Sequence, residues 1–238
     1  MKKVLLILIL FLSCYVIYNK TIDKKEYFLT IGDSLSKGIN EYGSFTYGYN
    51  EYIRDYLQKT GKLKGYNKTY TNIDYRIMDI VKILEYNETI DTNSLNYLIK
   101  KADIITISLG MNELYYKLND NNKNMYNYID NMLESYKKVF EYINLFHQKK
   151  IYILGYYNIT NKNTDIFEYA NYKLKKICKD YKLIYIDLSQ IFNNNPIYFN
   201  KKESFIPNTA GYKKISQIII EKYKNNWYNI LRNFITMT

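Results

Sequence analysis

One serine in the N-terminal part of this chain has the surroundings of a nucleophile. Ser34 follows a β-rich run, Tyr27 to Ile31, and lies in a turn that begins at Gly32. A serine hydroxyl attacks an ester carbonyl when a base accepts its proton and when hydrogen-bond donors face the negative charge that develops on the carbonyl oxygen. The backbone N–H of Ser34, at the start of an expected helix, is one such donor. These features predict acyl-transfer chemistry at Ser34.

A second polar residue is expected beside Ser34. The run from Asp103 to Leu109 is almost continuously apolar and β-branched, as in a strand buried on both faces, and Gly110-Met111-Asn112-Glu113 follows it. The side-chain amide of Asn112 can then donate to the same oxyanion, and Glu113 is expected to complement a helix N-terminus. Alone, Asn112 would be an ordinary turn residue and Ser34 an ordinary helix cap. Their functional interpretation depends on both being present.

Short β-rich runs alternate with segments of helical period along the chain. Strands are expected at 27–31, 66–73, 103–109, 150–156 and 183–187, and helices at 49–59, 77–84, 125–146, 165–181 and 209–225. This alternation predicts a three-layer α/β/α sandwich with a mostly parallel five-stranded sheet. Sites in such sheets form at the carboxyl ends of the strands, so Ser34 and Asn112 are expected at the same edge.

Composition indicates one domain and argues against several classes of function. No linker rich in Pro, Gly or Ser divides the 238 residues, so a single domain is expected at 27–230. The net charge of +11 would suit an anionic membrane surface or polymer, but lysines are abundant throughout the chain, which favours a compositional bias spread over the whole surface. Nucleic acid is not an expected partner, because no basic recognition helix or RNA-binding motif is present. Cys14 and Cys178 provide no disulfide framework or cysteine-based metal site, and no metal or cofactor is predicted.

The first residues have the pattern of an export signal. Met1-Lys2-Lys3 precedes a largely apolar run, Val4 to Tyr18, that Asn19-Lys20 closes. Such a run spans roughly 22 Å as a helix, against about 30 Å for a hydrocarbon core, so a signal peptide and a short signal anchor both fit residues 1–20. The lysines predict an extracytoplasmic protein, secreted or anchored to the cytoplasmic membrane. The alternative is a buried first element of a cytosolic domain.

Three blocks, in order, resemble those of the SGNH/GDSL hydrolase family. Ile31 to Ser36 (IGDSLS) is similar to the nucleophile block, and Ile107 to Glu113 (ISLGMNE) to the Gly-x-Asn-Asp block. Glu203 to Tyr212 (ESFIPNTAGY) is similar to the Asp-x-x-His-Pro-Asn-x-x-Gly-Tyr block. The resemblance implies a flavodoxin-like SGNH architecture and a serine ester hydrolase of the esterase, lipase or deacetylase class. Its substrate would be a small-molecule, glycan or lipid ester, with Ser34 as nucleophile and Asn112 as oxyanion donor.

Besides Glu113 in place of the final Asp of the second block, the chain departs from the family pattern at three positions. Ile206 stands at the position of the triad His and cannot accept a proton, and Glu203 stands at that of the triad Asp. Asp74 lies nearest the place of a family glycine whose N–H is an oxyanion donor. That N–H survives the change, although a carboxylate would oppose a nearby negative charge. The resemblance therefore implies a hydrolase that is atypical or impaired.

Two residues are candidates to replace the missing base. His147, the only histidine, is expected at the amino end of a strand, opposite the site, and is interpreted as a surface residue. Glu203 is one methylene longer than the family Asp, so we expect it to reach Ser34 directly or through water.

Two other functions fit parts of the sequence. A pseudoenzyme with this scaffold would keep a pocket for a glycan or acyl ligand without turning it over. A flavodoxin-like phosphate or flavin site would use Ser34, Ser36 and Lys37 in the turn between Gly32 and Gly38. The second alternative leaves Asn112 and the C-terminal block unexplained.

Overall fold

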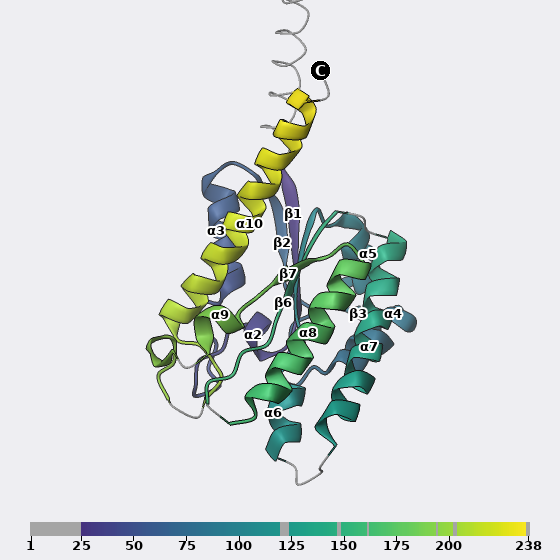
Figure 1. Cartoon of the computed structure of the whole chain (residues 1–238). Coiled ribbons are helices and arrows are strands. Elements are labelled where there is room, and N and C mark those ends of the chain that lie inside the picture. Colours follow the sequence, from purple (N-terminus) through teal and green to yellow (C-terminus); the bar gives the residue numbers. More distant parts are fainter. Residues whose placement is uncertain are drawn as a thin grey trace, which may run out of the picture.

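A five-stranded parallel sheet forms the centre of the computed structural model (Figure 1). The structure describes residues 25–119, 124–146, 149–160, 162–193, 195–201 and 204–236, with side chains up to residue 225. The strand order is β2-β1-β5-β6-β7, and every neighbouring pair is parallel. The strands are β1 (Glu26–Gly32), β2 (Leu63–Asn67), β5 (Ile104–Ser108), β6 (Lys150–Leu154) and β7 (Ile184–Ile186). The predicted fold class is confirmed.

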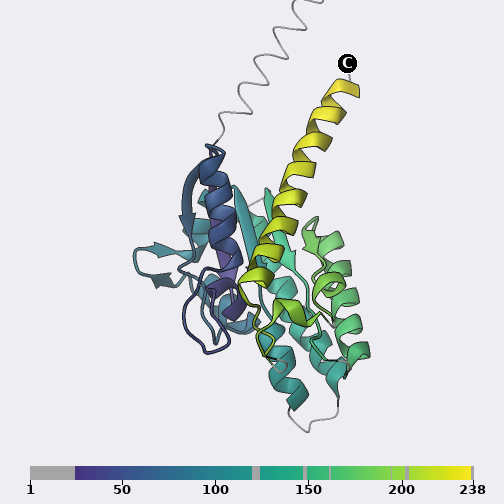
Figure 2. The same ribbon diagram turned by 90° about the vertical axis from the view of Figure 1, so that its left-hand side faces the viewer.

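Helices cover both faces of the sheet. On one face, α3 (Tyr49–Lys59) packs against the long α10 (Thr209–Thr236), and Figure 2 shows α10 continuing well past the end of the sheet. The other face carries α4 (Ile77–Glu85), α5 (Leu95–Lys101), α7 (Met125–Phe146) and α8 (Thr164–Asp180). The shorter elements are α2 (Ser34–Lys37), α6 (Met111–Asn119), α9 (Ser189–Phe192), η1 (Pro196–Tyr198) and the hairpin of β3 (Thr89–Ile90) and β4 (Asn93–Ser94).

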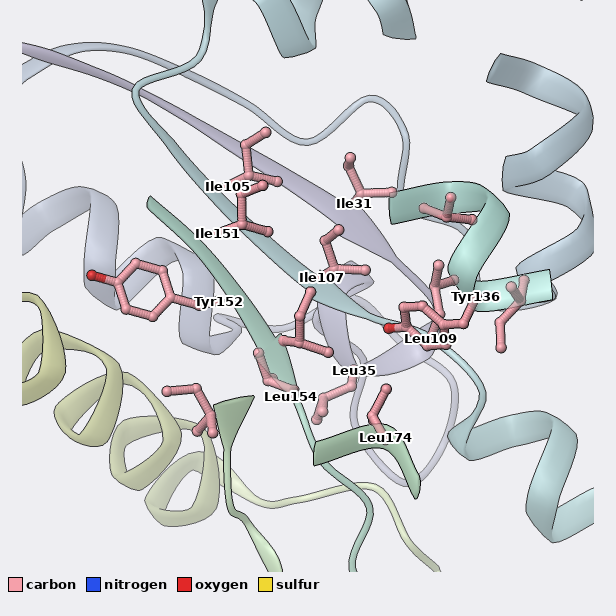
Figure 3. Packing of buried hydrophobic residues seen from close by; sticks show 14 of the residues in the cluster. Ile31, Leu35, Ile105, Ile107, Leu109, Tyr136, Ile151, Tyr152, Leu154 and Leu174 are labelled. Carbon is pink, nitrogen blue, oxygen red and sulfur yellow. The ribbon is translucent and has the colours of Figure 1, made fainter. Parts of the chain in front are cut away.

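The central strands are buried on both faces because their side chains are apolar in nearly every position. Ile31 of β1 is the register partner of Ile107 of β5, and Ile105 of β5 is that of Ile151 of β6 (Figure 3). All four side chains lie in the hydrophobic core. The same register pairs Gly32 with Ser108, the last residues of their strands. The chain segments that follow β1 and β5 therefore leave the sheet at the same level.

Some predicted boundaries differ from the structure. The second strand was expected at 66–73 but occupies Leu63–Asn67, because the Asn67 side chain accepts from the backbone N–H of Thr69 and turns the chain. Residues beyond this turn still run beside β1, where the Asn72 N–H donates to the carbonyl of Gly32 at 3.0 Å. Helices α5 and α6 were not anticipated, and α10 extends past residue 225.

The predicted location outside the cytoplasmic membrane is not upheld. Within the described ranges, no helix combines the length and the apolar character needed to cross a membrane. The signal peptide or anchor assigned to residues 1–20 lies outside the described residues, so no anchor is shown. The extracytoplasmic prediction and the membrane partner are therefore withdrawn. Glu203 and His147 also lie outside the described part of the chain.

Candidate active site

The turn after β1 presents Ser34 at the carboxyl edge of the sheet. Gly32 is required there, since a Cβ atom on it would lie 2.1 Å from the carbonyl oxygen of Ser108. Asp33 then caps α2, because its Oδ1 accepts from the backbone N–H of Leu35 at 3.2 Å. Ser34 is the first residue of α2, so its own N–H has no acceptor within that helix. This N–H remains available to an anionic oxygen.

The structure brings Ser34 and Asn112 together, as the sequence predicted. Ser34 Oγ donates to Asn112 Oδ1 at 2.9 Å, and Asn112 Nδ2 donates to the carbonyl of Ile73 at 2.6 Å. Ser34 is 4% exposed and Asn112 is 6% exposed. A side-chain amide carries two N–H groups, so Asn112 can satisfy Ile73 and still offer one donor to a substrate oxyanion. An amide oxygen is not a base, so this contact does not activate the Ser34 hydroxyl.

The segment that contains Asp74 lies against α6. The backbone N–H of Asp74 donates to Asn72 Oδ1 at 3.2 Å, so in this structure it serves the turn itself. At the other end of the segment, the backbone N–H of Ile77 donates to Glu113 Oε2 at 3.0 Å. Burial raises the pKa of the Glu113 carboxyl above its usual range. Asn112 and Glu113 thus hold both ends of residues 73–77.

The sequence assigned Glu113 only to a helix N-terminus, without identifying the helix. The structure shows that it caps α4 from α6, with 36 positions between Glu113 and Ile77. A sequence signal for this role exists, since the family block has an acid at the same place. The contact itself is decided by packing.

A buried polar network lies beneath the nucleophile turn. Asp33 is fully buried, and this desolvation raises the pKa of its carboxyl to about 7, against the hydrogen bonds from Leu35 and Ser108. Its Oδ2 has no hydrogen-bond partner among the described residues. Ser36 Oγ contacts Ser108 Oγ at 2.7 Å and the Tyr49 hydroxyl at 2.8 Å. These bonds tie the turn to β5 and α3, and the sequence analysis did not foresee them.

The C-terminal block packs at the same edge of the sheet. The ring of Phe205 stacks on that of Tyr115 of α6, with centroids 4.5 Å apart, and its carbonyl accepts from the Tyr157 hydroxyl at 2.6 Å. On the other side, the Tyr212 hydroxyl donates to the carbonyl of Ile39, just after α2, at 2.8 Å. Ile206 lies between these anchors in sequence and is 8% exposed.

A pocket of about 470 Å³ opens beside the Ser34–Asn112 pair. Its lining consists of one amide, three charged side chains and one phenol, contributed by Asp74, Arg76, Asn112, Glu113 and Tyr116. No group of three or more His, Cys, Asp or Glu side chains in the described part of the chain could hold a metal ion. The arrangement places a buried serine, an asparagine amide and a polar pocket close together.

Comparisons with known proteins agree with this geometry. A family model described as GDSL-like lipase/acylhydrolase matches residues 28–219. No curated protein matches the sequence significantly. Among solved structures, a lipase from a goat rumen metagenome is similar with a TM-score of 0.68 and 17% identity, over 83% of this chain and 97% of that one.

An acetylxylan esterase from Geobacillus stearothermophilus is also similar. Its TM-score is 0.64 at 18% identity, over 84% of this chain and 94% of that one. Structures described as catalytic mutants of that esterase carry alanine in place of a serine, an aspartate or a histidine, and the aspartate lies three positions before the histidine. At these identities the likeness shows the fold, an α/β sandwich shared with esterases and lipases.

Proposed function

The chain belongs to the GDSL-like lipase/acylhydrolase family, and on this premise we propose that it is a serine ester hydrolase whose Ser34 works without the family's histidine base. The observation that carries the proposal is the buried contact between Ser34 Oγ and Asn112 Oδ1 at 2.9 Å. It unites the serine and the asparagine of two blocks that are 78 positions apart. The substrate is a small-molecule, glycan or lipid ester.

In the proposed reaction, Ser34 Oγ attacks the ester carbonyl carbon, and the carbonyl oxygen becomes an oxyanion. The Ser34 N–H and the second N–H of the Asn112 amide stabilise that charge. A third donor is the Asp74 N–H, which must exchange its 3.2 Å bond to Asn72 for the oxyanion. Because the Asp74 carboxylate would oppose the charge, we expect this third donor to contribute least.

The proton of Ser34 has no histidine to receive it at the family position. In the similar acetylxylan esterase, an aspartate and a histidine three positions later are catalytic; here Glu203 and Ile206 have the same spacing. We assign Glu203 as the substitute base, acting directly or through water. Loss of the base in serine hydrolases costs about 10⁴ to 10⁶ in kcat, while oxyanion stabilisation and binding keep about 10³ to 10⁴ over water. The proposed enzyme is therefore slow.

One observation favours a second candidate function. Ile206, which we assign to the family's base position, is apolar and only 8% exposed. A protein of this fold that binds a glycan or acyl ligand without turnover would tolerate that residue.

Labelling with a fluorophosphonate probe separates the two functions. We expect slow labelling of the full chain, loss of labelling in Ser34→Ala, and unchanged labelling in the control Ser135→Ala on α7. Hydrolysis of short acetyl and aryl esters should depend on Ser34 in the same way. An unlabelled chain, with ester turnover equal in the Ser34→Ala variant, would leave only the binding function.

A further inference from the structure

The groove beside Asn112 continues along α6. The 470 Å³ pocket shares Arg76, Glu113 and Tyr116 with a second hollow of about 280 Å³, which Lys117 and Tyr128 also line. The two together form a groove that begins at the oxyanion donor and runs between α4 and α6 toward α7. Its size lies in the range of small-ligand sites. Asn112 lines this groove and is bonded to Ser34, so one side of an ester bound at Ser34 can extend into it.

Two charged side chains of this groove, Arg76 and Asp74, are not used by the fold. Arg76 and Asp74 are exposed and two positions apart, yet the guanidinium and the carboxylate form no hydrogen bond or ion pair with described residues. An arginine presents only donors and a carboxylate only acceptors. The groove therefore offers both kinds of partner close to the reaction centre.

The groove also has an aromatic wall. Tyr116 of α6 is 68% exposed, so its ring is open to a ligand. Aromatic rings pack well against flat apolar faces, and a phenol adds a polar end. The groove thus combines hydrogen-bond donors, acceptors and an aromatic face. This combination suits a ring-shaped ligand that has hydroxyl groups at its edge and C–H groups on its faces.

An acyl chain fits this groove poorly. Covering the Arg76 guanidinium and the Asp74 carboxylate with hydrocarbon removes their water without giving a hydrogen bond in return, which is unfavourable. A hydroxyl group both donates and accepts, so it replaces that water. An ester has an acyl side and an alcohol side, and the charged groups of the groove favour the alcohol side when that side carries hydroxyl groups.

We propose that the groove lined by Asp74, Arg76 and Tyr116 binds a sugar ring, and that it is the alcohol subsite of a glycan ester. This deepens the proposed hydrolase function and rests on it for the identity of the bound ester. Tyr116 stacks on the ring, while Arg76 and Asp74 bind adjacent hydroxyl groups. A chain of sugars would continue past Tyr116 toward Tyr128.

Binding without turnover gives the first test. Full-length protein is titrated with xylotriose, cellotriose and chitotriose by saturation-transfer NMR, with octanoate as the acyl probe. We expect at least one trisaccharide to bind, and Tyr116→Ala and Arg76→Gln to weaken that binding at least fivefold. The matched controls are Tyr172→Ala, a tyrosine of α8 that is 66% exposed, and Arg54→Gln of α3. Failure of all three sugars to bind, or binding of octanoate that Tyr116→Ala abolishes, overturns the proposal.

Hydrolysis gives the second test and separates the two proposals. In an Ile206→His, Glu203→Asp background, kcat/KM is compared for an acetylated methyl xyloside and for 4-nitrophenyl acetate. The factor by which Tyr116→Ala lowers kcat/KM should be at least ten times larger for the acetylated xyloside than for 4-nitrophenyl acetate. Equal losses would mean that Tyr116 only supports the site, and the sugar subsite would be wrong. Sugar binding that depends on Tyr116, with no hydrolysis in any background, would retain the subsite and reject the hydrolase.

Discussion

Ser34 gives its hydroxyl hydrogen bond to the amide oxygen of Asn112, at 2.9 Å, and so lies against a neutral amide instead of a base. Attack on an ester requires Ser34 to leave this bond and to lose its proton elsewhere. The second N–H of the amide can then donate to the oxyanion while the first stays with the Ile73 carbonyl.

Ile206→His, alone or with Glu203→Asp, should raise esterase activity. The new imidazole would accept the Ser34 proton, and we expect a gain of at least tenfold because general bases contribute about 10² to 10⁴. The measurement is kcat/KM with 4-nitrophenyl acetate. Ile197→His, at a position 69% exposed, is the control for a histidine placed elsewhere. An inert double variant would mean that Ile206 is not at the triad position or that the oxyanion hole does not form.

Glu203→Gln should abolish most of the residual hydrolysis. Glutamine has nearly the same size but cannot accept a proton at neutral pH, so the change removes only the proposed base. The rate of ester hydrolysis is compared with that of Glu221→Gln, an exposed acid on α10. Activity of Glu203→Gln equal to that of the unmodified chain would remove Glu203 from the mechanism.

Asn112→Ala should lower kcat by about 10² to 10³, the usual effect of losing one oxyanion donor. The Ile73 carbonyl also loses its partner, so we expect unfolding free energy to fall by about 1 kcal/mol. Both quantities are measured in the Ile206→His background, with Asn127→Ala on α7 as the control. A loss of stability without a loss of kcat would restrict Asn112 to a structural role.

Gly32→Ala should be strongly destabilising. The added Cβ would lie 2.1 Å from the Ser108 carbonyl oxygen in a buried turn, so we expect a loss of about 3 kcal/mol, at the upper end for overpacking. Gly43 has a φ of +77° but nothing within 4 Å of such a Cβ. Gly43→Ala should therefore cost only about 1 kcal/mol of backbone strain. Urea unfolding measures both, and equal losses would contradict the steric argument.

The stability of the protein should fall between about pH 4 and pH 7 because of Asp33. Burial raises the pKa of this carboxyl from 3.8 to about 7, so the folded state keeps its proton where the unfolded state has lost it. The contribution is complete below pH 4, declines as the pH rises, and is lost above pH 7. In the variant Asp33→Asn, the amide oxygen can still accept from the Leu35 N–H, but the side chain does not titrate. This variant should therefore lack the pH dependence that Asp33 causes.

Urea unfolding at pH 4.5 and pH 7.5 tests this dependence. The difference in unfolding free energy between the two pH values should shrink in Asp33→Asn by an amount on the order of a few kcal/mol. Parallel changes in the two proteins would show that Asp33 titrates alike in the folded and unfolded states.

Much of the fold was predictable because the central strands carry a strong local signal. Both faces of β1 and β5 are buried, and a strand in that position needs an apolar residue at nearly every place. The edge strand β2 (Leu63–Asn67) is only partly buried and includes Lys64 and Gly65. The apolar pattern of β2 is therefore weak, and the sequence placed this strand several residues too far toward the C-terminus.

The site was predictable where it depends on strand ends and not where it depends on packing. Ser34 and Asn112 follow adjacent parallel strands, so their proximity follows from topology. The bond between Glu113 and the Ile77 N–H, the burial of Asp33, and the groove at Arg76 depend on how α4, α6 and α2 sit on the sheet. No local periodicity encodes those distances.

The sequence by itself determined the side chains that are available: a serine in its turn, an asparagine after a buried strand, and Ile206 at the position proposed for the family's histidine. Side-chain identity alone settles that Ile206 cannot accept a proton. Only the tertiary structure decided that Ser34 is bonded to Asn112 and that Asp74, Arg76 and Glu113 line one pocket beside this pair. Hydrogen bonds act over about 3 Å, and segments far apart in the chain reach that distance only through packing of the whole core.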